Sequence, residues 1–141
     1  MTTSFVLDAS VALAWCFEDE TSTYAEHVLD YCAAAAEVYV TEIWALEIAN
    51  ALISAQRRGR IAEDRISEFL VQLFRFRITV ETSLPGRTLV AVRSLARSYG
   101  LTAYDASYLE LAIRRRLPLA TLDVDLKRAA GSAKVSLLDV P

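Results

Sequence analysis

Four acidic residues are the side chains of this sequence best suited to chemistry: Asp8, Glu47, Asp105 and Asp123. Each lies in or beside an apolar stretch, where an ionised carboxylate needs a partner or a function. Because they are far apart in the sequence, only the fold can bring them together. If they converge, the result is a site for a hard divalent cation such as Mg²⁺ or Mn²⁺, which prefers carboxylate and water oxygens.

A cluster of carboxylates needs such a cation for a physical reason. Carboxylates that lie close together repel one another, which raises some of their pKa values and destabilises the fold. A bound cation relieves the repulsion. It also allows a metal-activated water to attack a phosphodiester, with one or two ions stabilising the attacking and leaving oxygens.

The segment around Glu47 is an apolar helix with one polar face. Residues 43–55 read IWALEIANALISA, in which the only polar side chains are Glu47, Asn50 and Ser54. Steps of three and four residues place them on one side of a helix. Two interpretations remain open: a narrow solvent-facing stripe, or a Glu47 that points into a polar pocket while Asn50 orients it or a bound water.

The other three acids each have a structural alternative. Thr102 and Asp105 fit a capping box, in which the threonine caps the helix and the acid returns the bond. Asp8 and Asp123 could each cap the helix that follows. Caps use Ser, Thr, Asn and Asp almost equally, so acids at every one of these positions favour a shared site.

The elements that must position these acids alternate between short apolar runs and longer helical segments. We expect strands at residues 4–8, 37–40, 78–80, 119–122 and 135–137, and helices at residues 10–17, 21–36, 43–58, 62–76, 85–99, 102–116 and 124–130. Ser22 or Thr23 can cap the second helix, and Gly59 and Gly100 end two others. Short, nearly continuous apolar strands are typical of a parallel sheet covered by helices, so we predict a three-layer α/β/α fold. Ligands of such sheets bind beyond the carboxyl ends of the strands, where Asp8 and Asp123 are expected.

Composition sets the broad class. With 141 residues, 54% of them hydrophobic, the chain fits one domain, residues 1–141, and is not disordered. It contains no apolar run long enough to span a bilayer and no basic region before its first apolar run, so we expect a cytoplasmic protein without a membrane anchor. Cys16 and Cys32 lack a CxxC spacing, and His27 is the only histidine, which argues against a thiolate or histidine metal site.

The charge distribution leaves contact with phosphates open. The net charge of −3 does not suit a non-specific nucleic-acid coat protein. Arginines nevertheless cluster at residues 57–60, 75–77 and 114–116. These clusters are either solvated helix ends or contacts for phosphates.

Other functions are weaker fits. Phosphoryl-transfer enzymes of the haloacid dehalogenase type need a DxD motif after the first strand, but Asp8 is followed by Ala9 and Ser10. Neither GxGxxG nor GxxxxGK[ST] occurs, which disfavours dinucleotide and P-loop nucleotide binding. A catalytically inactive protein-binding module remains the alternative, although such a module has no need of a repulsive acidic cluster.

At these residues the chain resembles the PIN-domain ribonucleases, specifically the VapC-type toxins of prokaryotic toxin–antitoxin pairs. The matching stretches are VLDASVALAW at residues 6–15, ALEIANAL at 45–52, LTAYDASYLELA at 101–112 and LPLATLDVDL at 117–126. They occur in the family's order and extend over essentially the whole chain.

The resemblance implies a parallel-sheet α/β/α fold and a Mg²⁺- or Mn²⁺-dependent endoribonuclease that acts as the toxin of a type II pair. It further implies a homodimer and inhibition by a cognate antitoxin. The positions that match the family's catalytic and metal-binding acids are Asp8, Glu47, Asp105 and Asp123, and those that match its supporting polar residues are Ser10, Asn50 and Thr121.

Two positions depart from a unique match. Asp125 follows Asp123 closely and could also approach the metal, although an exposed place near the helix start suits it better. The segment before Ile43 lacks the proline that is often found there, which makes Glu42 a competitor of Glu47. Glu42 does not share the helix face of Asn50.

Overall fold

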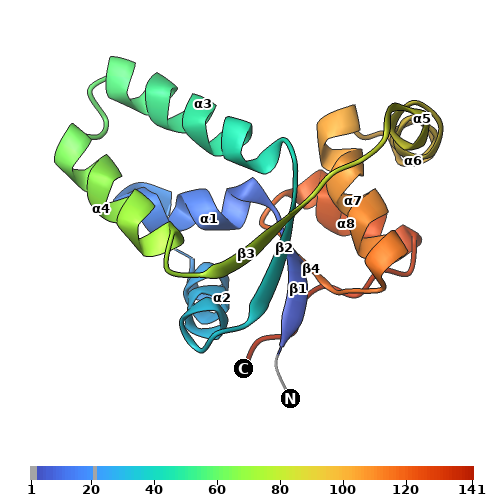
Figure 1. Ribbon diagram of the computed structural model, residues 1–141, viewed down its shortest axis with the longest axis horizontal. Coiled ribbons are helices and arrows are strands. Elements are labelled where there is room, and N and C mark those ends of the chain that lie inside the picture. The colour runs from blue at the N-terminus through green and yellow to red at the C-terminus, as the bar shows by residue number, and fades with distance from the viewer. Residues whose placement is uncertain (1–2, 21) are drawn as a thin grey trace.

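A parallel sheet runs through the centre of the computed structural model, which describes residues 3–20 and 22–141. Within these residues the sheet has four strands in the order β3-β2-β1-β4, and every neighbouring pair is parallel (Figure 1). The strands are β1 (Ser4–Leu7), β2 (Glu37–Thr41), β3 (Arg77–Glu81) and β4 (Leu119–Ala120). Phe5, Val6 and Leu7 of β1 are fully buried, which is why this strand reads as an unbroken apolar run.

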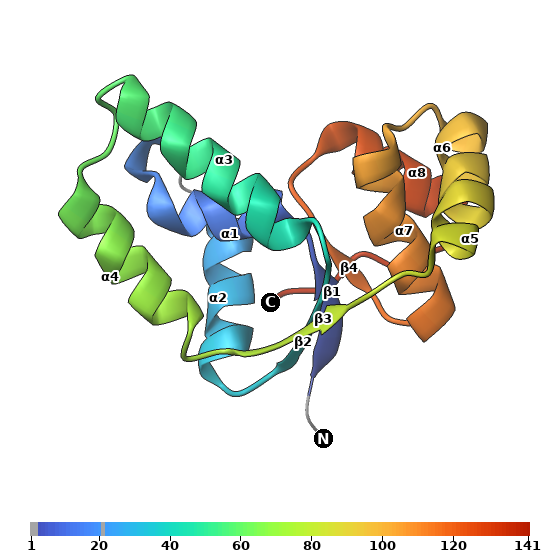
Figure 2. The same ribbon diagram turned by 45° about the horizontal axis from the view of Figure 1, so that its top comes forward.

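Helices cover both faces of the sheet. Helices α1 to α4 form one layer and α5 to α8 the other (Figure 2). Their bounds are α1 (Ala9–Cys16), α2 (Thr23–Ala33), α3 (Trp44–Arg57), α4 (Glu63–Leu73), α5 (Pro85–Arg87), α6 (Arg93–Tyr99), α7 (Ala103–Arg115) and α8 (Val124–Ser132), with a 3-10 helix at Glu18–Glu20 and a π-helical turn at Thr88–Val92. The predicted three-layer α/β/α fold with a parallel sheet is confirmed. In the part of the chain that the structure describes, no helix is both long and apolar enough to cross a membrane.

The strand order creates a topological switch point beside β1. The chain first adds β2 and β3 on one side of β1, and β4 then returns to the other side. Leu7 pairs with Ala120, so the carboxyl ends of β1 and β4 lie next to each other. The helices that follow these two strands, α1 and α8, belong to opposite layers. Ligands of open parallel sheets bind at such a switch point, and Asp8 directly follows β1 there.

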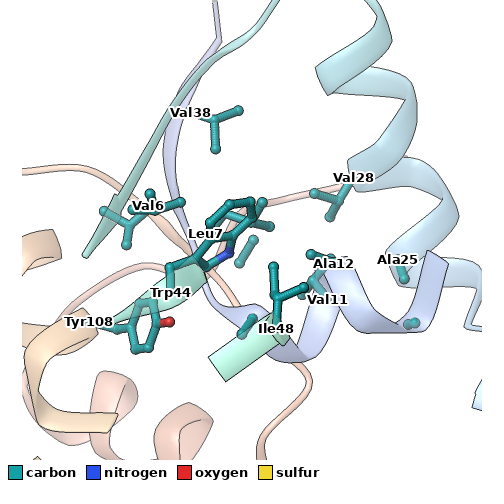
Figure 3. Packing of buried hydrophobic residues seen from close by; sticks show 14 of the residues in the cluster. Val6, Leu7, Val11, Ala12, Ala25, Val28, Val38, Trp44, Ile48 and Tyr108 are labelled. Atoms are coloured by element: carbon teal, nitrogen blue, oxygen red, sulfur yellow. The ribbon is translucent and has the colours of Figure 1, made fainter. Parts of the chain in front are cut away.

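The core fixes the position of α3, the helix that carries Glu47. Side chains of β1 and β2 pack against α1, α2 and the start of α3, as Figure 3 shows for Leu7, Val11 and Val28. Ile48 of α3 is 3% exposed and belongs to the same cluster. Glu47, the residue before it, is therefore held at the carboxyl edge of the sheet.

Two predicted elements differ from the structure. The strand expected at residues 135–137 is reduced to a single parallel bridge between Leu119 and Leu137, because β4 has only two residues and pairs at this edge through Leu119 alone. The start expected for the second helix, at Thr21, lies outside the described residues. In the structure α2 begins at Thr23 and Ser22 caps it, with Ser22 Oγ accepting a hydrogen bond from the Ala25 amide at 3.3 Å.

The helical segment that starts at Pro85 ends at Gly100, as predicted. Its middle widens into the π-helical turn, which the sequence did not indicate. Gly100 adopts the left-handed conformation, with φ of 65°, and its amide donates to the Ala96 carbonyl. Glycine suits this position because it has no Cβ to clash in that conformation.

We expect Gly100→Ala to lower the free energy of unfolding by about 1 kcal/mol, because an alanine is strained at positive φ. No atom lies within 4 Å of the Cβ that would be added, so the loss would be purely conformational. Gly86→Ala is the matched control: it adds a Cβ in equally open space within α5, where a helical backbone suits alanine. Urea unfolding of both variants measures the difference, and equal effects would contradict this account of Gly100.

Candidate active site

Asp8 lies at the carboxyl end of β1 and is only 4% exposed. Its backbone occupies the N-cap position of α1, but its side chain makes no capping bond. Instead Asp8 Oδ2 accepts hydrogen bonds from Ser10 Oγ at 2.6 Å and from Thr121 Oγ1 at 2.7 Å. The capping alternative for Asp8 is therefore wrong, and two hydroxyl groups fix the orientation of this buried carboxylate.

The same two hydroxyls hold the segment that follows β4. Ser10 Oγ accepts a hydrogen bond from the Leu122 amide at 3.0 Å, and Thr121 Oγ1 accepts one from the Asp123 amide at 3.0 Å. Ser10 and Thr121, which the sequence indicated as supporting residues, thus tie the ends of β1 and β4 together through Asp8.

Asp123 does cap a helix. Its Oδ2 accepts a hydrogen bond from the Leu126 amide at 2.8 Å, at the start of α8. Asp123 Oδ1 accepts none among the described residues, so this oxygen is left for another ligand. Asp125 lies on the exposed side of α8 and pairs with Arg128 at 3.0 Å, as expected for a residue at a helix start.

Asp105 forms only half of the expected capping box. Thr102 Oγ1 accepts a hydrogen bond from the Asp105 amide at 3.1 Å, which caps α7. The return bond from the Thr102 amide to the Asp105 carboxylate is missing from the hydrogen bonds of the described chain. The half-buried carboxylate of Asp105 therefore does not close the capping box, although the neighbouring Thr102 side chain lowers its pKa against the effect of burial.

Glu47 is held by a residue that the sequence analysis missed. Glu47 Oε1 accepts a hydrogen bond of 2.5 Å from the hydroxyl of Tyr108, whose side chain is fully buried. Asn50, predicted to orient Glu47, is exposed and contributes no hydrogen bond within the described residues. Two features of the sequence could have indicated Tyr108. It lies three residues after Asp105 on the same helix face, and a buried phenol needs a hydrogen-bond partner.

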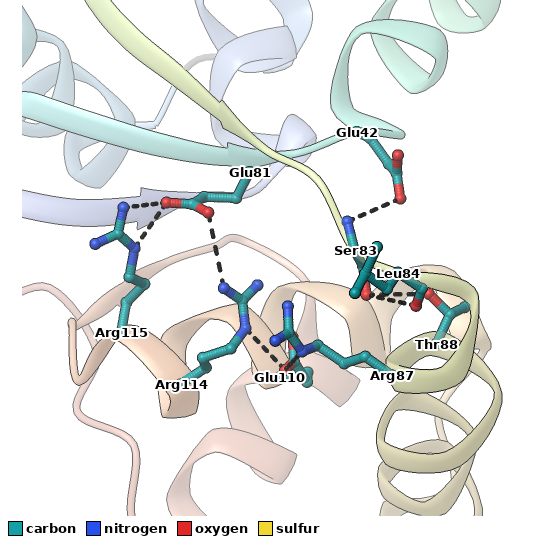
Figure 4. Close-up of polar contacts among 9 residues, drawn as sticks. All are labelled: Glu42, Glu81, Ser83, Leu84, Arg87, Thr88, Glu110, Arg114 and Arg115. Atoms are coloured by element: carbon teal, nitrogen blue, oxygen red, sulfur yellow. Dashed lines mark hydrogen bonds and ion pairs between the residues drawn. The ribbon is translucent and has the colours of Figure 1, made fainter.

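Glu42, the competitor of Glu47, faces a different neighbour. Its Oε1 accepts a hydrogen bond from the Ser83 amide at 3.3 Å, in the linker between β3 and α5 (Figure 4). This contact fastens the linker to the start of α3. Glu42 is not among the groups that shift the pKa values of the predicted site acids.

The four predicted acids influence one another electrostatically. Burial raises the pKa of Asp8, against the lowering effect of its two hydroxyl partners, and Asp123 raises it further. Burial also raises the pKa of Asp105 to about 6, with added contributions from the charges of Asp123 and Asp8. The pKa of Glu47 is raised by burial, lowered by the bond from Tyr108, and raised again by Asp8 and Asp105. The fold thus brings the four carboxylates within electrostatic reach of each other.

The chemistry of these donors fits a hard cation, although the carboxylates are not drawn tightly together. They offer acceptor oxygens, no thiolate or imidazole, and an excess of negative charge, which suits Mg²⁺ or Mn²⁺. Within residues 3–20 and 22–141, no three His, Cys, Asp or Glu side chains form a group arranged to hold a metal ion. Mutual repulsion of the carboxylates favours this separation, so ion binding would need side-chain adjustment.

Several of the clustered arginines are already engaged with acids. Arg114 lies 3.0 Å from Glu110 and 3.7 Å from Glu81, and Arg115 also pairs with Glu81 (Figure 4). Arg60 pairs with Asp19 at 2.9 Å. These three arginines form ion pairs within the protein, and the side chains of Arg60 and Arg115 also remain partly exposed.

The remaining arginines of the clusters differ in their distance from the site. Arg77 begins β3, so it and Arg75 lie at the amino edge of the sheet, opposite the carboxylates. Arg57 and Arg58 follow Glu47 along α3 by ten residues or more, which is about 15 Å along a helix. Arg57 and Arg58 are placed to contact a long ligand that extends from the acids along α3.

Comparison with known proteins gives consistent matches over nearly the whole chain. The model of the PIN domain family matches residues 5–132. Ribonuclease VapC3 of Pyrobaculum aerophilum is 34% identical over 121 residues, which are 86% of this chain and 90% of that protein.

Solved structures give the same picture. The crystal structure of PAE2754 from Pyrobaculum aerophilum matches with a TM-score of 0.69 and 27% identity, covering 92% of this chain and 86% of that one. FitAcB from Neisseria gonorrhoeae matches with a TM-score of 0.64 and 21% identity over 96% of both chains. VapBC2 from Rickettsia felis, bound to a DNA fragment from its promoter, matches with a TM-score of 0.60 and 13% identity over 99% of this chain and 100% of that one. The last two matches show the fold alone.

We expect Thr121→Val to lower the free energy of unfolding by about 1–3 kcal/mol, because a buried carboxylate and a backbone amide both lose their partner. Thr121 is fully buried, and its hydroxyl contacts both Asp8 and the Asp123 amide. Thr121→Ser keeps the hydroxyl, so its free energy of unfolding should fall less than that of Thr121→Val. Urea unfolding measures both variants, and a valine variant as stable as the wild type would contradict this role.

Stability of the metal-free protein should fall as the pH rises from about 4 to about 6. The pKa of Asp105 is raised from 3.8 to about 6, so in this interval the folded state binds the proton more tightly than the unfolded chain does. The stabilisation is present at low pH and is lost as the pH passes the folded pKa. The loss from Asp105 should be about 1 kcal/mol, less than the full shift implies because solvent screens the half-buried group.

Urea unfolding in the presence of EDTA across this pH interval tests the expectation. The pH dependence should be weaker in Asp105→Asn, which cannot titrate at this position. Asp139→Asn changes an acid far from the site and should leave the pH dependence as in the wild type. A wild type whose stability rises over the interval would refute the expectation.

Proposed function

Because the chain belongs to the PIN domain family, we propose that it is a divalent-metal-dependent endoribonuclease that acts as the toxin of a type II toxin–antitoxin pair. The observation that carries the proposal is the electrostatic coupling of four carboxylates at the switch point of the sheet. RNA is the proposed substrate because a relative with 34% identity is named a ribonuclease. Single-stranded or loop RNA fits best, since its unstacked bases and backbone are accessible to a protein surface.

In this proposal the four acids are direct or water-mediated ligands of Mg²⁺ or Mn²⁺. The ion, when bound, supplies an activated water and stabilises charge on the phosphodiester oxygens. Asp8 is the member that cannot move freely, since Ser10 and Thr121 hold its Oδ2. Ser10 and Thr121 thus act on the site by keeping Asp8 in one orientation.

The other acids would adjust around Asp8. Asp123 keeps one oxygen on the α8 amide and has the other available. Asp105 has a pKa near 6, so protons compete with the cation for it at mildly acidic pH. The role predicted for Asn50, to hold a water near Glu47, remains a proposal, and its exposure leaves room for that water.

The arginines at the end of α3 are the proposed contacts for the RNA backbone beyond the cut. Arg57 and Arg58 are exposed and make no ion pair within the described residues. Their distance from Glu47 corresponds to a few nucleotides of extended RNA. The cluster at residues 75–77 is not assigned this role because it lies at the amino edge of the sheet. Arg114 and Arg115 are not assigned it because they pair with acids of the protein.

Two protein partners are part of the proposal: a cognate antitoxin and a second copy of this chain. Each needs an apolar surface, and exposed apolar patches are typical of protein interfaces. One surface is the groove between α3 and α4, which Trp44, Leu70 and Leu73 line and beside which Phe74 is 79% exposed. The other surface lies on α5 and the π-helical turn, where the exposed apolar residues are Leu84, Leu89 and Val90.

The alternative is a catalytically inactive module that acts only through such partners. It would not require the raised pKa values of Asp8, Glu47 and Asp105, which cost folding free energy. A metal-dependent gain in thermal stability therefore separates the two functions. A module without a metal site should show none.

We expect the wild type to cleave single-stranded RNA in the presence of Mg²⁺ or Mn²⁺, and Asp8→Asn and Asp105→Asn to lose roughly 100-fold or more of this activity. Asp125→Asn is the control, because Asp125 is exposed and paired with Arg128. It should retain activity within about threefold. Thermal unfolding with each cation should show stabilisation of the wild type and less of it in Asp8→Asn.

Equal activity in the wild type, Asp8→Asn and Asp105→Asn would refute the assignment of the site. If Asp125→Asn lost as much cleavage activity as Asp123→Asn, the role proposed for Asp123 would instead be assigned to Asp125. Activity that persists in EDTA would contradict the dependence on a metal.

A further inference from the structure

Two of the acids stand on helices from opposite layers of the fold. Glu47 lies in the first turn of α3 and Asp105 in the first turn of α7, and these helices flank different faces of the sheet (Figure 2). Among the described residues, one side-chain hydrogen bond joins the two helices: that from the Tyr108 hydroxyl to Glu47 Oε1, at 2.5 Å. The core places the start of α3, and this bond sets the orientation of the Glu47 side chain relative to α7.

Glu47 has little else to hold it. Its side chain has three rotatable torsions, and its neighbours on the same turn, Leu46 and Asn50, are exposed. Fixing such a side chain costs up to about 2 kcal/mol of conformational entropy. Without the bond from α7, Glu47 would sample several rotamers at the edge of the site.

Tyr108 is a rigid donor. Its ring is fully buried and packs at the edge of the core near Trp44, with the hydroxyl oxygen turned toward α3 (Figure 3). Because the core fixes the ring, the position of the Tyr108 hydroxyl does not depend on Glu47. Tyr108 therefore loses little conformational entropy when the hydrogen bond forms. Asp105 lies one turn earlier on the same helix, so one rigid element sets the positions of both acids.

A neutral donor suits this place better than a charged one. The phenol occupies Glu47 Oε1 and leaves Oε2 available as a ligand. A lysine or arginine here would also bind Glu47, but its charge would neutralise the carboxylate and repel a cation. The pairing of a buried tyrosine with Glu47 thus orients the carboxylate and preserves its negative charge.

We infer that Tyr108 is a positioning residue, which fixes Glu47 for the divalent cation and sets its spacing from Asp105. The inference rests on the proposed metal-dependent function. Tyr108 does not itself contact the cation and acts only through Glu47.

The test is the affinity of the full chain for Mn²⁺, measured by titration calorimetry without RNA. Tyr108→Phe keeps the ring and removes the hydroxyl, and it should weaken Mn²⁺ binding by about 10- to 100-fold. Glu47→Asp shortens the side chain, withdraws the carboxylate from Tyr108 and leaves the core intact, so it should weaken binding by a similar factor. Tyr24→Phe is the matched control, since its hydroxyl donates to the Leu138 carbonyl at 3.0 Å, away from the site.

A double-variant cycle separates positioning from a general loss of structure. In a Glu47→Gln background, Tyr108→Phe should change Mn²⁺ affinity less than twofold, because the group through which Tyr108 acts has already been altered. Full additivity of the two losses would overturn the inference. So would Mn²⁺ binding that is the same in the wild type and in Tyr108→Phe. A wild type that binds no Mn²⁺ would overturn the proposed metal dependence, and this inference with it.

Discussion

The arrangement at the carboxyl edge of the sheet depends on one buried carboxylate and its two hydroxyl donors. Asp8 would be a costly residue at 4% exposure without partners, and Ser10 and Thr121 make it tolerable. The same hydroxyl groups accept hydrogen bonds from backbone amides of the segment after β4. These hydrogen bonds therefore also join the ends of β1 and β4. The hydroxyl of Thr121 that satisfies the buried Asp8 thereby also places Asp123 beside Asp8.

The remaining acids show how a fold can gather negative charge without preassembling a metal site. Each has a different anchor: the α8 amide for Asp123, the phenol of Tyr108 for Glu47, and the helix start for Asp105. These anchors orient the carboxylates and partly offset the cost of burial. They do not cancel the mutual repulsion, which remains visible in the raised pKa values and leaves the group ready for a positive charge.

The architecture was largely predictable from the sequence. Nearly continuous apolar runs such as β1 indicated a parallel sheet, because burial on both faces restricts the residue type. Glycines marked helix ends, because positive φ favours glycine. The prediction of a fifth strand at residues 135–137 was wrong because the short run Val-Ser-Leu does not reveal whether its partner strand is long enough to pair with it. The acids that come together could be identified, but the alternatives for each one could not be separated by sequence alone.

Contacts between distant segments limited the prediction of the site. Whether Asp8 caps α1 or accepts a bond from Thr121 depends on where β4 lies, which no local pattern states. Tyr108 was missed for the same reason, since its partner is 61 residues away in the sequence. The ion pairs of Arg114 and Arg115 with Glu81 likewise required the fold, because a run of arginines looks the same whether it meets acids, phosphates or water.

The position of β4 in the chain has a consequence for protein synthesis. A ribosome makes β1, β2 and β3 first, and for most of that time β1 has no neighbour on its outer edge. Asp8 then lacks its Thr121 partner, and Asp123 has not yet been made. The proposed catalytic group is thus incomplete in the nascent chain until the segment with Thr121 and Asp123 has been made and has paired beside β1, by topology alone.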